Sequence, residues 1–184
     1  NRTMVQMLQN AEADVRKVLP NFNSARLMGE NIDVFHKDPS HQRNMLERLS
    51  GTYKTEITVG VRKFHLVANP IIDADGNRLG SVVEWSDVTN ERNTEEELRN
   101  VVDAAANGDF TQRVPLENKE GFLKAMATGI NTISETCAEG LNDIADMMQA
   151  LSRGDLTQRI NNDFGGTFAR LREDCNETAD RLSD

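Results

Sequence analysis

The spacing of apolar residues divides the chain into two parts with different periods. Before about residue 90, three segments alternate apolar and polar positions, which is typical of strands with one buried face. Beyond that point apolar residues recur every three or four positions, which is typical of helices that bury a narrow stripe. The pattern therefore predicts an α+β domain followed by an all-α region.

Helices are predicted to precede the strands in the first part. One helix is expected over 1–19, ending at Pro20, and a short helix over Ser24–Met28, ending at Gly29. A further turn of helix leads into a longer helix that begins near Pro39.

The strands are predicted to form an antiparallel, hairpin-rich sheet. The segments are 55–61, with Ile57, Val59 and Val61 on one face; 64–68, with Phe64, Leu66 and Ala68; and 79–87, with Val83 and Trp85. The string Asp73–Asn77 is expected to turn the second strand into the third. One face of such a sheet is free to cover a ligand.

The second part contains an internal repeat. The string NGDFTQRV at 107–114 returns as RGDLTQRI at 153–160, 46 positions later. After each copy a second helix is expected, from Gly121 and from Gly166, and these two helices are 45 positions apart. The two connectors therefore differ in length by one residue.

Each repeat unit is predicted to consist of a helix, a stop, an extended connector and a second helix. Because glycine tolerates the left-handed conformation at a helix end, Gly108 and Gly154 are expected to end the first helices. Apolar side chains are expected to hold the connectors against the helices. They are Phe110 and Val114 in the first copy, and Leu156 and Ile160 in the second.

A single apolar seam runs through the long helix that the two units share. Its members are Leu123, Met126, Ile130, Ile133, Cys137, Leu141, Ile144, Met148 and Leu151. Two successive steps of four around Cys137 form a stutter, which locally unwinds a coiled coil. One continuous helix is therefore expected from about Gly121 to Arg153. Because so narrow a seam cannot form the core of a monomer, the pattern predicts a parallel, dimeric four-helix bundle.

Composition narrows the classes of function. The formal net charge of −9 at pH 7 argues against nucleic acid as a partner, because phosphate binding requires a basic surface. The acidic residues are expected on solvated helix faces, as in NTEEELRN. No catalytic motif stands out, so we expect a protein that is not an enzyme. The isolated Cys137 and Cys175 favour a reducing, cytoplasmic setting for this fragment. Its apolar runs are too short to cross a membrane, which leaves a membrane-associated full-length protein open.

Residues 95–184 resemble tandem HAMP domains, the linked pair of cytoplasmic poly-HAMP chemoreceptors. The resemblance rests on the Gly-Asp helix ends, the paired connector hydrophobics and the glycine-phenylalanine strings that open the second helices. It divides this part into a linker or output helix over 90–97, a first HAMP-like unit over 98–138 and a second over 139–184. It implies a bistable dimeric bundle that signals to a kinase-control domain outside this fragment, which works with a histidine kinase and an adaptor.

Residues 1–89 resemble most of a chemoreceptor PAS domain, whose first two strands would precede this chain. The strings FHKDPSHQR at 35–43 and GSVVEWSDVTNER at 80–92 carry the resemblance. It implies an α+β PAS sensor domain in front of the HAMP-like units.

The string Asp87-Val88-Thr89 resembles the PAS exit motif, in which the last strand turns into an output helix. That helix is expected to begin near Asn93. Asp87 and Thr89 are therefore candidate residues for passing a signal from the sensor to the relay.

A physical argument for haem starts from His36 and Trp85. Haem iron takes a neutral imidazole on one axial side, and oxygen bound on the other side benefits from a hydrogen-bond donor. His36 follows Phe35 in a predicted turn of helix, and Trp85 is expected to face inward from the last strand. The wall of the pocket is expected to consist of Ile57, Val59, Phe64, Leu66 and Val83.

The same strings resemble the haem-binding PAS domain of soluble Aer-like oxygen receptors. This resemblance implies a b-type haem with His36 as axial iron ligand, and a diatomic gas such as O2 as the signal. It also implies that Trp85 stabilises the bound oxygen and that Leu66 lines the distal side. His41 is the rival ligand or a partner of a haem propionate, and His65 is expected to face solvent. The alternatives are another small ligand, FAD, or a cofactor-free dimerisation stalk.

Overall fold

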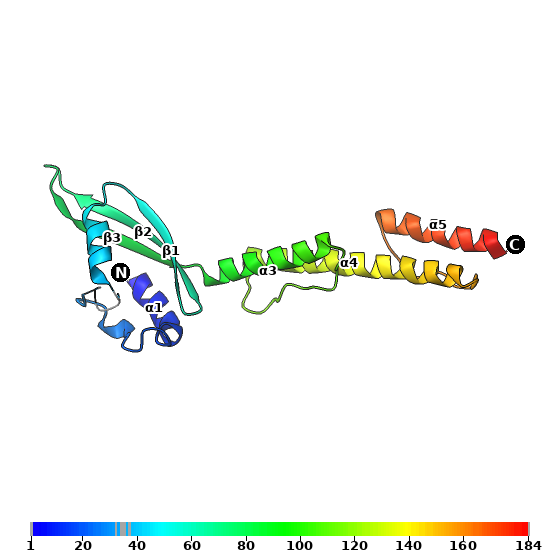
Figure 1. The fold of residues 1–184 in the computed structure, drawn as a ribbon, viewed down its shortest axis with the longest axis horizontal. Helices are drawn as coiled ribbons and strands as arrows, with labels where there is room; N and C mark the ends of the chain where they lie inside the picture. The colour runs from blue at the N-terminus through cyan, green and yellow to red at the C-terminus, as the bar shows by residue number, and fades with distance from the viewer. Residues whose placement is uncertain (1, 32, 34–35, 37, 184) are drawn as a thin grey trace. The chain divides into compact units, whose positions relative to one another are not determined.

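The computed structural model describes residues 2–31, 33, 36 and 38–183. The chain forms two compact units, Asn1–Asn93 and Thr94–Asp184. Figure 1 shows the helices and strands of both and labels most of them.

The first unit combines helices with a three-stranded antiparallel sheet, as the periodicity predicts. Its helices are α1 (Arg2–Val15), the 3-10 turn η1 (Ser24–Arg26) and α2 (Pro39–Glu47). Its strands are β1 (Tyr53–Val59), β2 (Arg62–Ile72) and β3 (Arg78–Asp87), in the order β1-β2-β3. The turn of helix expected around Phe35 falls partly on residues outside the described ones.

The strand pairing brings the predicted inward positions onto one face of the sheet. Ile57 pairs with Phe64, Leu66 with Trp85, and Ala68 with Val83, and paired residues share a face. Val61, which was expected on this face, instead lies in the turn between β1 and β2 and is 61% exposed. Positive φ at Gly60 (63°) ends the alternation one residue earlier.

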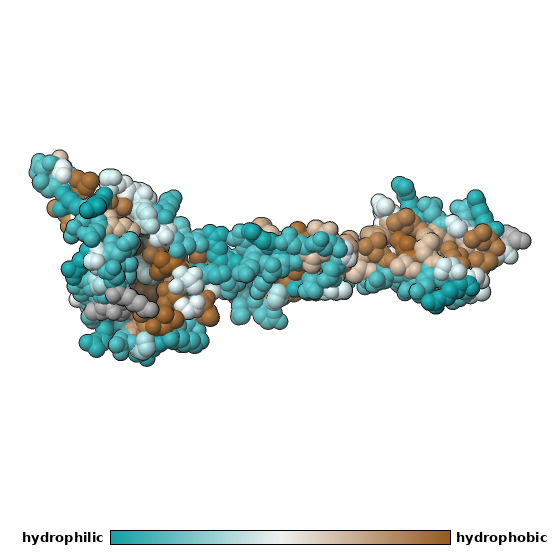
Figure 2. All heavy atoms as spheres, in the orientation of Figure 1, coloured by the Kyte–Doolittle hydropathy of each residue, from teal (hydrophilic) through white to brown (hydrophobic). Residues whose placement is uncertain are grey.

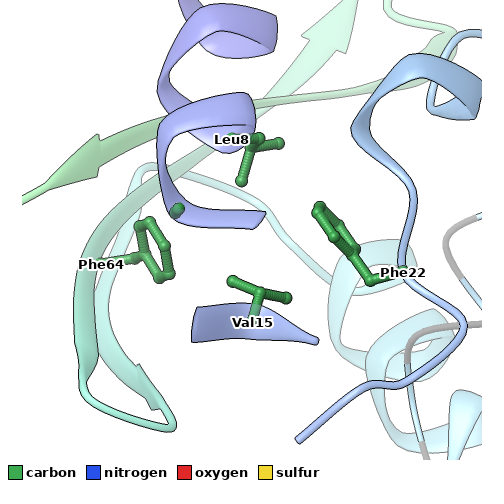
Figure 3. Packing of buried hydrophobic residues seen from close by; sticks show 5 residues of the cluster. Leu8, Val15, Phe22 and Phe64 are labelled. Carbon is green, nitrogen blue, oxygen red and sulfur yellow. The ribbon is translucent and has the colours of Figure 1, made fainter. Parts of the chain in front are cut away.

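The core of the first unit lies between α1 and this face of the sheet. It consists of Leu8, Ala11, Val15, Phe22 and Phe64, and Figure 3 shows Leu8 and Val15 of α1 between the rings of Phe64 and Phe22. The expected helix over 1–19 is too long, because α1 ends at Val15. The N–H of Val18 donates to the carbonyl of Val15 at 3.1 Å, so the chain tightens into a turn before Pro20. The helix expected over Ser24–Met28 is likewise only the short 3-10 turn η1.

The described part of the second unit consists of helices and connectors. The helices are α3 (Thr89–Ala106), which begins in the first unit, α4 (Gly121–Ser152) and α5 (Gly166–Ser183). The continuous helix predicted across Cys137 is confirmed. The predicted start of the output helix near Asn93 is wrong, because α3 begins four residues earlier, at Thr89. There the carboxylate of Asp87 accepts from the Thr89 N–H at 3.0 Å and ties the start of the helix to the end of β3.

The apolar seam of α4 is only partly covered by this chain. The buried residues of α4 are Ala127, Ser134, Gly140 and Met147, which lie beside the predicted seam. Three seam members remain open to solvent, with Ile133 60%, Leu141 45% and Met148 43% exposed. Figure 2 shows apolar surface along this helical unit. Among the described residues, no helix is both long and apolar enough to span a membrane.

Candidate functional site

The candidate ligand face is the inward face of the sheet in the first unit. Phe64 is 1% exposed, and its ring lies edge-on to the indole of Trp85, with 5.6 Å between centroids. Leu66, directly opposite Trp85, is half-buried. The predicted wall residues Ile57, Val59, Phe64, Leu66 and Val83 all lie on this face.

Helix α1 covers one end of this face, and a side-chain bond reaches the chain beyond α2 near the other. At the end near the β1–β2 turn, α1 packs over Ile57, Val59 and Phe64. Near the other end, the guanidinium of Arg78 donates to the carbonyl oxygen of Leu49 at 2.7 Å, just beyond α2. The stretch between them stays partly exposed, and it contains Leu66, Val83 and Trp85.

The indole of Trp85 is a hydrogen-bond donor without a partner among the described residues. Trp supplies one N–H and no acceptor, so a partly buried indole on an apolar face gains from any ligand oxygen placed against it. The chemical groups of the residues present are therefore those that a haem site needs. They offer a half-buried imidazole, an apolar wall and a free N–H donor in the same unit.

The three histidines lie in different settings. His36 is half-buried, and its backbone N–H donates to the carbonyl of Asp33 at 3.1 Å. His41 is exposed on α2. His65 lies on the opposite face of the sheet from Trp85, where its Nδ1 is 3.7 Å from the Oε1 of Glu56. His65 therefore cannot share a site with Trp85. Phe35, named with His36, lies outside the described residues.

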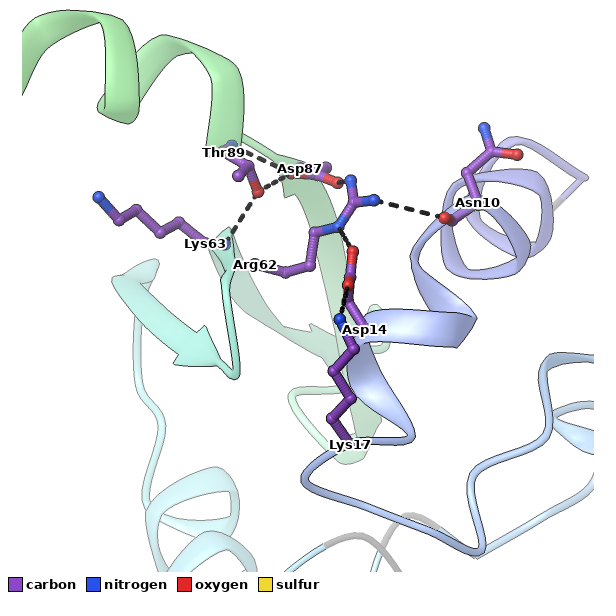
Figure 4. Close-up of polar contacts among 7 residues, drawn as sticks. All are labelled: Asn10, Asp14, Lys17, Arg62, Lys63, Asp87 and Thr89. Atoms are coloured by element: carbon purple, nitrogen blue, oxygen red, sulfur yellow. Dashed lines mark hydrogen bonds and ion pairs between the residues drawn. The ribbon is translucent and has the colours of Figure 1, made fainter. Parts of the chain in front are cut away.

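The end of the sheet carries a polar network that joins β3, β2 and α1, and Figure 4 shows it. The Nε of Arg62 donates to Asp14 at 2.8 Å, and its Nη1 donates to Asp87 at 3.1 Å. The Thr89 hydroxyl oxygen accepts from the backbone N–H of Lys63 at 3.0 Å. The exit motif is thus tied both to the neighbouring strand and, through Arg62, to the helix that covers the ligand face.

Charge strengthens this network. Partial burial opposes the charged form of Arg62, but its hydrogen bonds and the charges of Asp14 and Asp87 raise its pKa above the ordinary value. Hydrogen bonds from Lys17 and from Arg62 lower the pKa of Asp14. Sequence reasoning singled out Asp87 and Thr89 but missed Arg62 and Asp14, which are 48 residues apart along the chain.

The repeated Gly-Asp strings form two copies of one turn. Gly108 and Gly154 have φ of 85° and 80°, which confirms the predicted left-handed helix ends. After each glycine the aspartate accepts from the backbone N–H of the threonine two residues on, at 2.9 Å for Asp109 and 3.0 Å for Asp155. Hydrogen bonds from the threonine hydroxyls, together with these backbone bonds and those from the next glutamine, lower the pKa of both aspartates. The shared string is therefore explained by turn geometry.

Beyond each turn, the connector inserts one apolar residue between two helices. Val114 is 1% and Ile160 6% exposed, whereas Phe110 and Leu156 are half-buried. Val114 packs with Val101 of α3 and Ala127 of α4, and Ile160 packs with Met147 of α4 and Ala179 of α5. These clusters are the cores of the two repeats.

Two asparagines bond to the connectors, and sequence reasoning missed both. The side chain of Asn131 bonds to both backbone groups of Val114, and that of Asn176 does the same to Ile160. The available signal was the repeat itself, because the two second helices carry asparagine at positions 45 apart.

One acidic residue departs from the solvated setting expected for NTEEELRN. The Nζ of Lys119 lies 2.6 Å from the Oε2 of Glu97, and the Lys119 side chain is only 5% exposed. This pair, in which Lys119 is buried and Glu97 half-buried, joins the first connector to α3. In the second repeat Phe164 takes the place of Lys119 near the end of the connector. Its ring centroid lies 5.9 Å from that of Phe168.

Comparisons with known proteins relate the chain to one domain family and to one larger protein. The HAMP domain family matches residues 118–184. The chain is 49% identical over 183 residues to the methyl-accepting chemotaxis protein McpB of Pseudomonas aeruginosa. The aligned region covers 100% of this chain and 27% of that protein. The chain therefore spans about a quarter of the length of this relative.

A solved structure is also similar to part of the chain. It is the Aer2 receptor from Vibrio cholerae, described as a dual PAS-haem oxygen sensor, with 32% sequence identity and a TM-score of 0.45. The similarity covers 48% of this chain and 81% of that one. The chain is therefore similar along its whole length to part of a methyl-accepting chemotaxis protein, and its residues 118–184 match the HAMP domain family.

Proposed function

We propose that this chain is the sensing and relay part of a chemotaxis receptor. The observation that carries the proposal is the pair of connector units joined by one uninterrupted helix, α4. Such a helix is the second helix of one unit and the first helix of the next, so a change of packing in one alters the other. The 49% identity to a chemotaxis receptor along the whole chain supports the same function.

The relay is proposed to be a tandem HAMP pair in a parallel dimer. The exposed seam residues Ile133, Leu141 and Met148 support it, because they leave an apolar stripe that a second copy of α4 can cover. Two packings of such a bundle convey a signal only if a ligand binds one sensor state more tightly than the other. Downstream, a kinase-control domain with a histidine kinase and an adaptor would read the bundle.

The sensor is proposed to bind b-type haem on the inward face of the sheet and to sense a diatomic gas such as O2. His36 would hold the iron, and Trp85 would donate its free N–H to the bound gas. Ile57, Val59, Phe64, Leu66 and Val83 would wall the site, with His41 as rival ligand or propionate partner. Motion of β3 would reach α3 through Asp87 and Thr89.

An absorption spectrum of the haem-reconstituted chain tests the ligand. A Soret band is expected, and it should disappear in His36→Ala. His65→Ala is the matched control, because His65 lies on the other face of the sheet. Trp85→Leu should keep the band and weaken O2 binding roughly tenfold, the effect of losing one hydrogen bond.

The alternatives are the other outcomes of the same experiment. A band that survives His36→Ala but not His41→Ala would move the iron ligand to His41. A colourless protein after reconstitution would end the haem proposal. It would leave another small ligand, FAD or a cofactor-free stalk, with the relay unaffected.

A further inference from the structure

Asn131 and Asn176 make the same contact in the two repeats. The Oδ1 of Asn131 accepts from the Val114 N–H at 2.7 Å, and its Nδ2 donates to the Val114 carbonyl at 2.9 Å. In the second repeat the corresponding bonds between Asn176 and Ile160 measure 2.9 and 3.0 Å. Each asparagine therefore satisfies both backbone groups of the one connector residue that is buried between two helices.

Asparagine is suited to this contact by its chemistry. Its planar amide carries an acceptor and a donor side by side, so it pairs with a residue's N–H and C=O as a neighbouring strand would. The connectors have no regular secondary structure, so their buried backbone groups need partners of this kind. Aspartate would keep the acceptor and lose the donor, and leucine would lose both.

A difference between the two repeats shows that the contact is specific. Asn131 lies 17 residues after Val114, whereas Asn176 lies 16 residues after Ile160. One residue is therefore missing between the connector and the helix in the second repeat, yet the same pair of bonds forms. If chain length set the position of the connector, this deletion would shift the pairing by one residue. The asparagine sets it instead.

We propose that Asn131 and Asn176 are positioning residues that fix each connector to the second helix of its unit. The inference rests on the proposed relay function. It means that when the bundle changes its packing, the connector moves with the second helix and slides against the first. Val114 then moves with α4 relative to Val101 of α3.

Amide hydrogen exchange of the full 184-residue chain, read residue by residue by NMR without ligand, tests the proposal. In Asn131→Leu the Val114 amide should exchange roughly tenfold faster, while the Ile160 amide keeps its rate. In Asn176→Leu the Ile160 amide should become the faster one, and the Val114 amide should keep its rate. Asn142→Leu, at an exposed position of α4, is the control and should change neither.

Three results would overturn the assignment. One is a Val114 amide that stays protected in folded Asn131→Leu, and another is equal loss of protection at Val114 and Ile160, which would indicate general loosening. Asn131→Asp covers the case in which the leucine variant fails to fold. It keeps the acceptor, so the Val114 amide should stay protected while the melting temperature falls. A Val114 amide that exchanges freely in the folded aspartate variant is the third contrary result.

This test and that of the proposed function fail separately. A colourless protein with a protected Val114 amide removes the haem and leaves the connector contact. A protected amide in a receptor whose output never responds to its ligand removes the relay and leaves the contact as a feature of the fold.

Discussion

Gly140, in the interior of α4, faces the ring of Phe168 in α5. A β-carbon at this position would lie 2.6 Å from the Cδ1 of Phe168, closer than non-bonded carbons pack. Glycine lowers helix stability in a helix interior, so its presence here is unfavourable for α4 considered alone. The missing side chain is what allows the ring to lie against the helix.

Replacing Gly140 by alanine is expected to lower the free energy of unfolding by about 1 kcal/mol. Overpacking costs about 1–3 kcal/mol, and the better helix propensity of alanine returns up to about 1 kcal/mol. Urea denaturation measures the difference.

Gly129→Ala is the matched control in the same helix, because a β-carbon there meets no heavy atom within 4 Å. This variant should raise the free energy of unfolding by about 0.5–1 kcal/mol. If both variants are stabilised to the same degree, Phe168 is not held against α4 as described.

Residue roles in the sensor could be predicted wherever they follow the period of a strand. Alternation placed Trp85 with Leu66 on the inward face and His65 on the other, and the strand pairing confirms both. The same reasoning could not find Arg62 and Asp14, since an ion pair between residues 48 apart has no local pattern. Whether His36 binds iron stays a prediction.

At the scale of elements, the two aspartate turns make the fold sensitive to acid. Their bonds lower the pKa of Asp109 and Asp155 below the ordinary value of 3.8. A carboxylate with a lowered pKa stabilises the fold fully above the pKa of the unfolded chain. That contribution is lost as the pH falls through the lower, folded value.

Asp155→Asn is therefore expected to lower the melting temperature near neutral pH and to have less effect as the pH falls below about 4. Thermal melts of wild type and variant across this range measure the convergence. Asp163→Asn is the control, because its side chain is 99% exposed and its ion pair with Arg172 lies at the surface, where such pairs contribute little. It should leave the melting curve nearly unchanged. A difference between wild type and Asp155→Asn that stays constant with pH would contradict the role of the charge.

Elements were predictable where one signal dominates. The β2–β3 hairpin follows from its Asp-Gly turn, and α4 follows from a long helical period with no breaker. The end of α1 and the start of α3 were misplaced, because the bond from Thr89 to Asp87 and the tightening before Pro20 are local hydrogen bonds. The connector contacts were missed for a related reason, since asparagine within a helix more often lies in solvent.

At the scale of the whole molecule, the exposed seam predicts self-association. The chain has a mass of 20.6 kDa, and sedimentation at micromolar concentration should give about twice that value. Burying an exposed leucine contributes about 1.5–3 kcal/mol. A lysine at Leu141, which is 45% exposed on the seam, should therefore shift the equilibrium toward monomer.

Leu79→Lys serves as the control, because Leu79 is 67% exposed in the β2–β3 hairpin, outside the helical unit. It should leave the sedimentation unchanged. A wild-type chain that sediments as a monomer would remove the dimeric bundle from the proposed function.

The continuity of α4 has a consequence for how such chains can change in length. Each residue turns an α-helix by about 100° and advances it by about 1.5 Å. One residue inserted near Cys137 would therefore rotate the second repeat by more than a quarter turn, whereas seven would restore the facing to within about 20°. A residue inserted in a connector causes no such rotation, because an asparagine fixes the connector to its helix. The two connectors already differ in length by one residue. Insertions and deletions among related genes should accordingly collect in the connectors. In α4 they should occur only in steps that nearly complete whole turns, roughly 7, 11 or 18 residues.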